Sequence, residues 1–80
     1  MNPDIELSKY FQESALLKAE QEGITAKQKK DLNKIALGFG SYQEMRSGVY
    51  KIKSEEFMKL KKNYTVGFLL LTEYFEKLWD

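Results

Sequence analysis

Apolar residues recur at intervals of three and four along most of this chain, which is the spacing of one face of an α-helix. The pattern is strongest near the end, where the intervals are 3, 4, 4, 3, 4 and 3 for Phe57, Leu60, Tyr64, Phe68, Leu71, Phe75 and Leu78. A second stripe covers residues 5–17. Apolar and polar residues alternate only over residues 49–53, too few to make a sheet alone, so we expect an all-α fold.

Residues that start and stop helices divide the chain into segments. Asn2 can cap a first helix with Pro3 at its first position, and Gly23 supplies a left-handed stop. The segments 25–28 and 41–44 both read as capping boxes, in which the first and last side chains satisfy free N–H groups of the helix. Each of these two segments therefore predicts the start of a helix.

These signals predict four to five helices in a single domain covering residues 1–80. The second helix is expected over residues 25–37. Residues 38–40, Gly-Phe-Gly, are expected to form a turn, and a short third helix follows over residues 41–47. Residues 49–53 are interpreted as an extended loop.

Ser54 opens the last helical segment, which we expect to cover about residues 55–80. Gly67 weakens a continuous helix by about 1 kcal/mol relative to alanine, and Thr65 could cap a separate second piece. The sequence leaves open whether residues 55–79 form one helix or two.

Four motifs in the middle of the chain follow one another in an informative order. They are Glu22-Gly23-Ile24-Thr25 through Leu32, Ala36-Leu37-Gly38, Arg46-Ser47-Gly48, and Ser54-Glu55-Glu56-Phe57-Met58-Lys59-Leu60. This order resembles the phage lambda-repressor-like helix-turn-helix family, in which a Gly-Leu/Ile-Thr step opens the second helix and a Leu-Gly turn leads to the recognition helix. The resemblance covers roughly residues 5–66. Ala26 departs from it, because the family usually has a phosphate-contacting glutamine there.

The resemblance implies a helix-turn-helix at about residues 25–48 that binds double-stranded DNA, with Tyr42 packed inward. The residues implied to face the bases in the major groove are Ser41, Gln43, Glu44 and Ser47. Gln43 is the natural reader of adenine. The residues implied to contact the DNA backbone are Thr25, Lys27, Gln28, Lys29, Lys30, Lys51 and Lys53.

The distribution of charge also favours an anionic partner. The whole chain has a net charge of +1, but residues 27–62 alone carry +6, whereas residues 1–26 carry −3 and residues 63–80 carry −2. The favoured hypothesis is a small DNA-binding transcriptional regulator of phage or mobile-element type. The alternative is a helical adaptor or inhibitor that binds another protein through its aromatic C-terminal helix, in which case the lysines form a solvated surface.

Several other functions lack their usual residues. The chain has no cysteine, no histidine, no Gly-x-Ser-x-Gly elbow and no phosphate-binding loop, so we expect no enzymatic activity, no metal and no cofactor. The longest apolar run, Val66–Leu71, is too short to span a bilayer. Asp4 and Glu6 occupy the place of the basic region of a secretory signal, so the cytoplasm is the expected location.

The final apolar stripe is longer than the other predicted helices can cover, which predicts a homodimer. The residues expected to form the self-association surface are Phe68, Leu71, Tyr74, Phe75, Leu78 and Trp79. Pairing would bury this surface and would stabilise a small domain.

Overall fold

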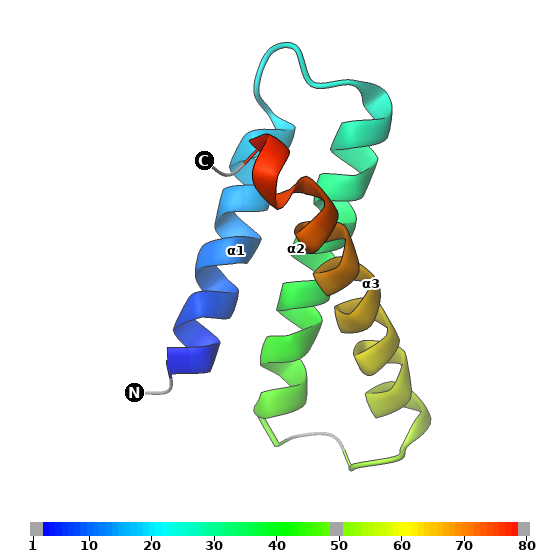
Figure 1. The fold of residues 1–80 in the computed structure, drawn as a ribbon. Helices are drawn as coiled ribbons and strands as arrows, with labels where there is room; N and C mark the ends of the chain where they lie inside the picture. Colours follow the sequence, from blue (N-terminus) through cyan, green and yellow to red (C-terminus); the bar gives the residue numbers. More distant parts are fainter. Residues whose placement is uncertain (1–2, 49–50, 79–80) are drawn as a thin grey trace.

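The structure is a computed structural model that describes residues 3–48 and 51–78, with the side chains of residues 4–48 and 51–76. The described residues form three helices, namely α1 (Pro3–Ala19), α2 (Ala26–Arg46) and α3 (Glu55–Leu78), as Figure 1 shows. No strand is present in these described parts of the chain. The prediction of an all-α fold is confirmed, and the prediction of four to five helices is wrong.

Helix α2 occupies the centre of the molecule. Both α1 and α3 pack mainly against α2 rather than against each other. In Figure 1, α1 and α2 run side by side in opposite directions, while α3 crosses in front of α2. The start of α3 consequently lies far from α1, and only its last turns approach the end of α1.

Four of the predicted helix ends are confirmed, whereas the end near residue 37 and the capping box that was to start a third helix at residues 41–44 are wrong, because α2 runs through both. Gly23 and Gly48 have positive φ angles of 84° and 79°, which end the preceding helical segments in the left-handed conformation. At Thr25 both halves of the capping box form, because its hydroxyl accepts the N–H of Gln28 and the Gln28 side chain accepts the N–H of Thr25. Ser54 caps α3, since its Oγ accepts the Phe57 N–H at 3.2 Å. Part of the predicted loop at residues 49–53 lies outside the described residues.

The predicted turn at residues 38–40 is wrong, because α2 continues through it without interruption. Gly38 lies where α2 and α3 come closest. A Cβ atom added to Gly38 would lie 2.7 Å from the carbonyl oxygen of Asn63 and 2.9 Å from the Cα of Gly67. Gly38 therefore allows two helix backbones to approach each other, and the helix-turn-helix predicted at residues 25–48 is not formed.

Helix α3 is likewise continuous, which answers the question that the sequence left open. Gly67 sits inside the helix as the other half of the close crossing. Thr65 does not cap a second piece, because its hydroxyl donates to the Lys61 carbonyl oxygen at 2.9 Å within the same helix.

The core is small and centres on α2. Leu32 and Ile35 are its largest fully buried side chains. The complete set of buried apolar residues in the described part of the chain is Ala15, Ala19, Leu32, Ile35, Ala36, Phe39, Leu71 and Tyr74. One polar contact fixes α1 on α2, since the buried Ser8 Oγ donates to the Phe39 carbonyl oxygen at 2.7 Å.

Candidate functional site

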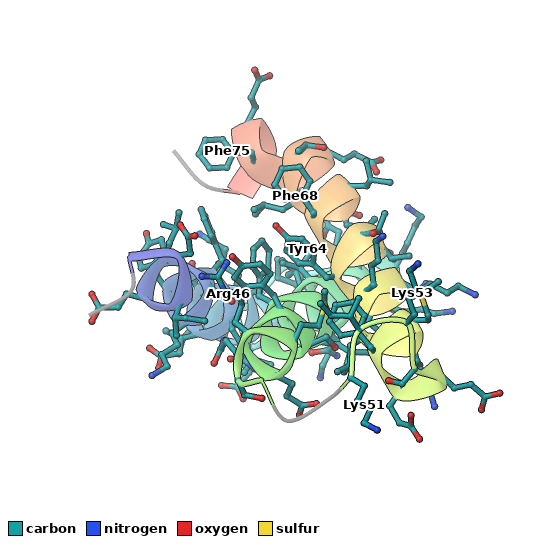
Figure 2. All side chains as sticks on the ribbon, turned by 90° about the horizontal axis from the view of Figure 1, so that it is seen from below. Arg46, Lys51, Lys53, Tyr64, Phe68 and Phe75 are labelled. Atoms are coloured by element: carbon teal, nitrogen blue, oxygen red, sulfur yellow. The ribbon has the colours of Figure 1, made fainter. Side chains whose placement is uncertain are left out.

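A groove runs between α1 and α3, and α2 forms its floor. The residues that line it are Asp4, Leu7, Ser8, Phe11, Phe39, Tyr42, Tyr64, Phe68 and Leu71. We call this surface the aromatic groove. In Figure 2, Tyr64, Phe68 and Phe75 follow one another along the side of α3 that faces α1. The groove exists because α1 and α3 pack on α2 but diverge from each other.

Aromatic rings from all three helices contact one another in this groove. Phe11 of α1 lies 5.4 Å from Phe39 of α2, measured between ring centroids, and Phe39 lies 5.8 Å from Tyr64 of α3. Tyr64 also contacts Tyr42 at 4.8 Å and Phe68 at 6.0 Å. These separations are those of favourable aromatic pairs, so the rings hold one another in place.

The floor of the groove is buried, whereas its rims are exposed. Phe39 is buried, and burial is the main cause of a raised pKa at Tyr64, with smaller contributions from Tyr42 and Asp4. Tyr64 therefore keeps its neutral hydroxyl. On the rims, Leu7 and Phe68 remain exposed. An apolar floor with exposed apolar rims is typical of a surface that a partner covers.

Charged side chains stand at one end of the groove. The Arg46 guanidinium lies 5.9 Å from the centre of the Tyr42 ring, and its Nη1 is 4.0 Å from Oδ2 of Asp4. Both charged side chains are largely exposed, so their attraction contributes little to stability. Their position gives this end of the groove a polar border.

Helix α3 has more apolar surface than the fold buries. In the run Val66–Leu71, Gly67 and Leu71 face the core, but Val66, Phe68 and Leu69 are 39%, 46% and 61% exposed. A helix with apolar residues on all sides is usually covered by other helices or by lipid. None of the helices in the described part of the chain is long and apolar enough to cross a membrane. Exposed apolar residues that lie close together often mark an interaction surface, so this part of α3 is a candidate contact surface.

The structure separates the six residues predicted for self-association. Phe68 and Phe75 are exposed along the side of α3 that faces α1. Leu71 and Tyr74 are instead buried in the core, although Leu71 also lines the aromatic groove. The side chains of Leu78 and Trp79 lie outside the described residues. One edge of the predicted stripe therefore belongs to the core of the protein itself.

The four residues predicted to read bases do not share a separate helix. Ser41 is buried, and the Gln43 amide donates to Oγ of Ser8 at 3.3 Å and to Oε1 of Gln12 at 2.9 Å. Glu44 and Ser47 are exposed near the end of α2. Two of the four candidates are therefore occupied within the fold, and Gln43 fastens α1 to α2.

The residues predicted to contact the DNA backbone fall into two distant groups. Thr25 and Gln28 are bonded to each other in the capping box, and Lys27, Lys29 and Lys30 are exposed beside them. Lys51 and Lys53 lie in the loop beyond the other end of α2 (Figure 2). Because α2 has 21 residues, its ends are about 30 Å apart. The two groups do not form one surface.

Two features of the structure were not foreseen. The first is the α1 side of the groove, where Leu7 and Phe11 were assigned only to a helical stripe. The second is a buried hydrogen bond in which the Tyr74 hydroxyl donates to Oδ2 of Asp31 at 2.5 Å. The sequence did contain a sign that Asp31 is buried. It lies four residues before Ile35, and this spacing puts both residues on the inner face of α2.

The described residues contain no group of three or more His, Cys, Asp and Glu side chains that could hold a metal ion. Comparisons with models of protein families, with curated proteins and with solved structures found no significant match.

Proposed function

We propose that this chain is a non-enzymatic helical module that binds another protein in its aromatic groove. The observation that carries this proposal is the continuous contact of aromatic rings across all three helices beneath exposed apolar rims. Buried aromatic side chains supply much of the affinity in protein interfaces. The module would serve as an adaptor or as an inhibitor of its partner.

An amphipathic helix is the shape of partner that fits this groove best. Helices α1 and α3 both pack on α2, so a partner helix that covers the groove would contact residues of all three helices. A helix with apolar residues at intervals of three and four would place them between Phe11 and Phe68. The Tyr42 hydroxyl and the Arg46 side chain at the polar end can bind polar groups of such a helix.

The aromatic side chains of the groove are also preorganised for binding. Tyr64 contacts rings on both sides, at 5.8 Å from Phe39 and 6.0 Å from Phe68. Immobilising a mobile side chain on binding costs about 0.5–1.5 kcal/mol. Because these rings are already held in place, most of that cost is avoided when a partner binds.

Selection of peptides on the intact protein tests the proposal. Displayed helical peptides selected for binding should carry apolar residues at intervals of three and four. They should bind Phe68→Glu at least about tenfold more weakly, because the new carboxylate stands on the rim of the groove. Leu37→Glu is the control, since Leu37 is an equally exposed apolar residue of α2 outside the groove. Peptides that bind both variants equally well would rule the groove out.

Double-stranded DNA remains a second candidate ligand, favoured by the lysines near the start of α2. Lys29, Lys30 and Lys34 are exposed, and none forms a salt bridge with another described residue. Without a separate recognition helix, we propose that these lysines bind phosphates with no base preference. The role of a transcriptional regulator would then require a partner that selects the DNA sequence.

Binding to random duplex DNA at several salt concentrations tests this second candidate. The logarithm of the affinity should fall with the logarithm of salt concentration, with a slope of about 0.9 per phosphate contacted. Changing Lys29 and Lys30 together to glutamate should abolish binding at moderate salt. The same change at Lys51 and Lys53 serves as the comparison at the other end of α2. Absence of binding at low salt would remove the candidate.

A further inference from the structure

The outer face of α3 carries a second regular pattern, distinct from the stripe that faces the core. Its residues follow one another at intervals of 4, 3, 4, 3 and 4, and all are exposed: Met58, Lys62, Thr65, Leu69, Thr72 and Glu76. We call this set the outer seam. This spacing is the one by which two helices pack along a common line. Since Gly67 and Leu71 face α2, the outer seam points away from the rest of the protein.

The charges beside the outer seam are divided by sign along the helix. Between Met58 and Glu76, the first half contains Lys59, Lys61 and Lys62, and the second half contains Glu73 and Glu76. A second α3 running in the opposite direction would place lysines against glutamates at both ends. A parallel second helix would place like charges together, which costs free energy.

The middle of the outer seam is suited to close packing. Leu69 is the most exposed apolar residue of α3, at 61%, and short threonine side chains lie on both sides of it. The hydroxyl of Thr65 donates to the Lys61 carbonyl oxygen at 2.9 Å, and that of Thr72 donates to the Leu69 carbonyl oxygen at 2.7 Å. Because both hydroxyls already have partners within α3, a contact that excludes water leaves no unsatisfied donor.

We propose that two copies of this chain pair through their outer seams, with the two α3 helices antiparallel and crossing at Leu69. Lys62 precedes Leu69 by as many residues as Glu76 follows it. A two-fold axis at Leu69 therefore brings Lys62 of each copy opposite Glu76 of the other. The pairing uses a different face from the aromatic groove, so it stands independently of the proposed function and leaves both grooves open.

Reversal of the two charges tests the direction of pairing. Lys62→Glu and Glu76→Lys should each raise the dissociation constant of the dimer about tenfold, because two attractive pairs become repulsive. The variant with both changes should regain pairing, and so should an equal mixture of the two single variants. Both side chains are exposed, so folding, followed by circular dichroism, should not change.

Sedimentation equilibrium measures these constants and can also overturn the proposal. Leu69→Glu should give a folded monomer, whereas Leu37→Glu, a change at an equally exposed leucine outside the seam, should still pair. A wild-type protein that stays monomeric up to about 100 µM contradicts the proposal, because even small protein interfaces usually bind in that range. So does a double charge variant that remains as weak as the single variants. Loss of pairing in Phe68→Glu but not in Leu69→Glu would place the dimer contact at the groove instead.

Discussion

Asp31 is a buried carboxylate on α2, and its hydrogen bonds explain how this burial is tolerated. It accepts the Tyr74 hydroxyl at 2.5 Å, and the exposed Lys27 ammonium lies 3.4 Å from the same oxygen. The Tyr74 bond is the main reason why the pKa of Asp31 is lowered, while burial acts in the opposite direction. Conversely, the bond to Asp31 raises the pKa of Tyr74.

These two shifts predict the pH range in which the pair stabilises the fold. The folded pKa of Asp31 lies below its unfolded value, so its contribution is present above the unfolded pKa and is lost as pH falls through the folded pKa. The folded pKa of Tyr74 lies above its unfolded value, so its contribution is present below the unfolded pKa and is lost as pH rises through the folded pKa. The free energy of unfolding should therefore decrease in both acid and alkali.

Tyr74→Phe tests this pair, because it removes the hydroxyl and keeps the ring. We expect it to lower the free energy of unfolding by about 1–3 kcal/mol, measured with urea at neutral pH, and to raise the pKa of Asp31 in an NMR titration. Tyr10→Phe is the matched control, since the Tyr10 ring is exposed. An unchanged Asp31 pKa in Tyr74→Phe would show that the hydroxyl does not hold the carboxylate.

At the scale of the helices, the crossing of α2 and α3 depends on two glycines. A Cβ atom on Gly67 would lie 2.9 Å from the Cα of Gly38 and 3.0 Å from the Lys34 carbonyl oxygen, and these backbone atoms cannot move without separating the helices. A Cβ atom on Gly40 would meet only the Nε2 end of the Gln12 side chain, at 2.7 Å. Glycines of α2 that look alike in the sequence therefore have different roles.

Alanine substitution should separate these roles by the size of the effect on the free energy of unfolding. Gly38→Ala and Gly67→Ala should lower the free energy of unfolding by about 1–3 kcal/mol, because the overlap outweighs the better helix propensity of alanine. Gly40→Ala should change it by less than about 1 kcal/mol, because the better helix propensity of alanine offsets the Gln43–Gln12 hydrogen bond that is lost when the Gln12 side chain turns away. Urea unfolding of the three variants checks this. A stabilised Gly38→Ala would mean that the helices are not in such close contact.

The distinction between local and distant interactions explains what the sequence could predict. The cap at Thr25 and the stop at Gly48 depend on residues within one helical turn, and both were predicted correctly. The turn at residues 38–40 was predicted wrongly. Gly38 is a glycine because its backbone lies in close contact with that of Gly67, which is far along the chain. Likewise Leu71 fits the spacing of an outer stripe as well as that of the core, and only the packing on α2 shows that it is buried.

At the scale of the whole molecule, the three helices described in this chain of 80 residues do not cover their own apolar surface. A chain of this size buries only about 60% of the surface that its unfolded form exposes. On α3 the uncovered part includes two faces, since Phe68 borders the aromatic groove and Leu69 lies on the outer seam. The α3 side of the groove was predictable from the spacing of its aromatic residues. The α1 side was not, because the sequence does not show that α1 lies opposite α3.

Pairing through the outer seam should make the thermal stability depend on protein concentration. The dimer contains only folded chains, so mass action raises the melting temperature as the total concentration increases. For a domain of this size the expected rise is on the order of 3 °C for each tenfold increase.

In Leu69→Glu the melting temperature should be independent of concentration, whereas Leu37→Glu, which changes an exposed leucine outside the seam, should behave as the wild type does. Differential scanning calorimetry over a hundredfold range of about 5–500 µM measures this. A wild-type melting temperature that stays constant over the range would mean that the chain folds and functions as a monomer, with the surface of α3 left for other proteins.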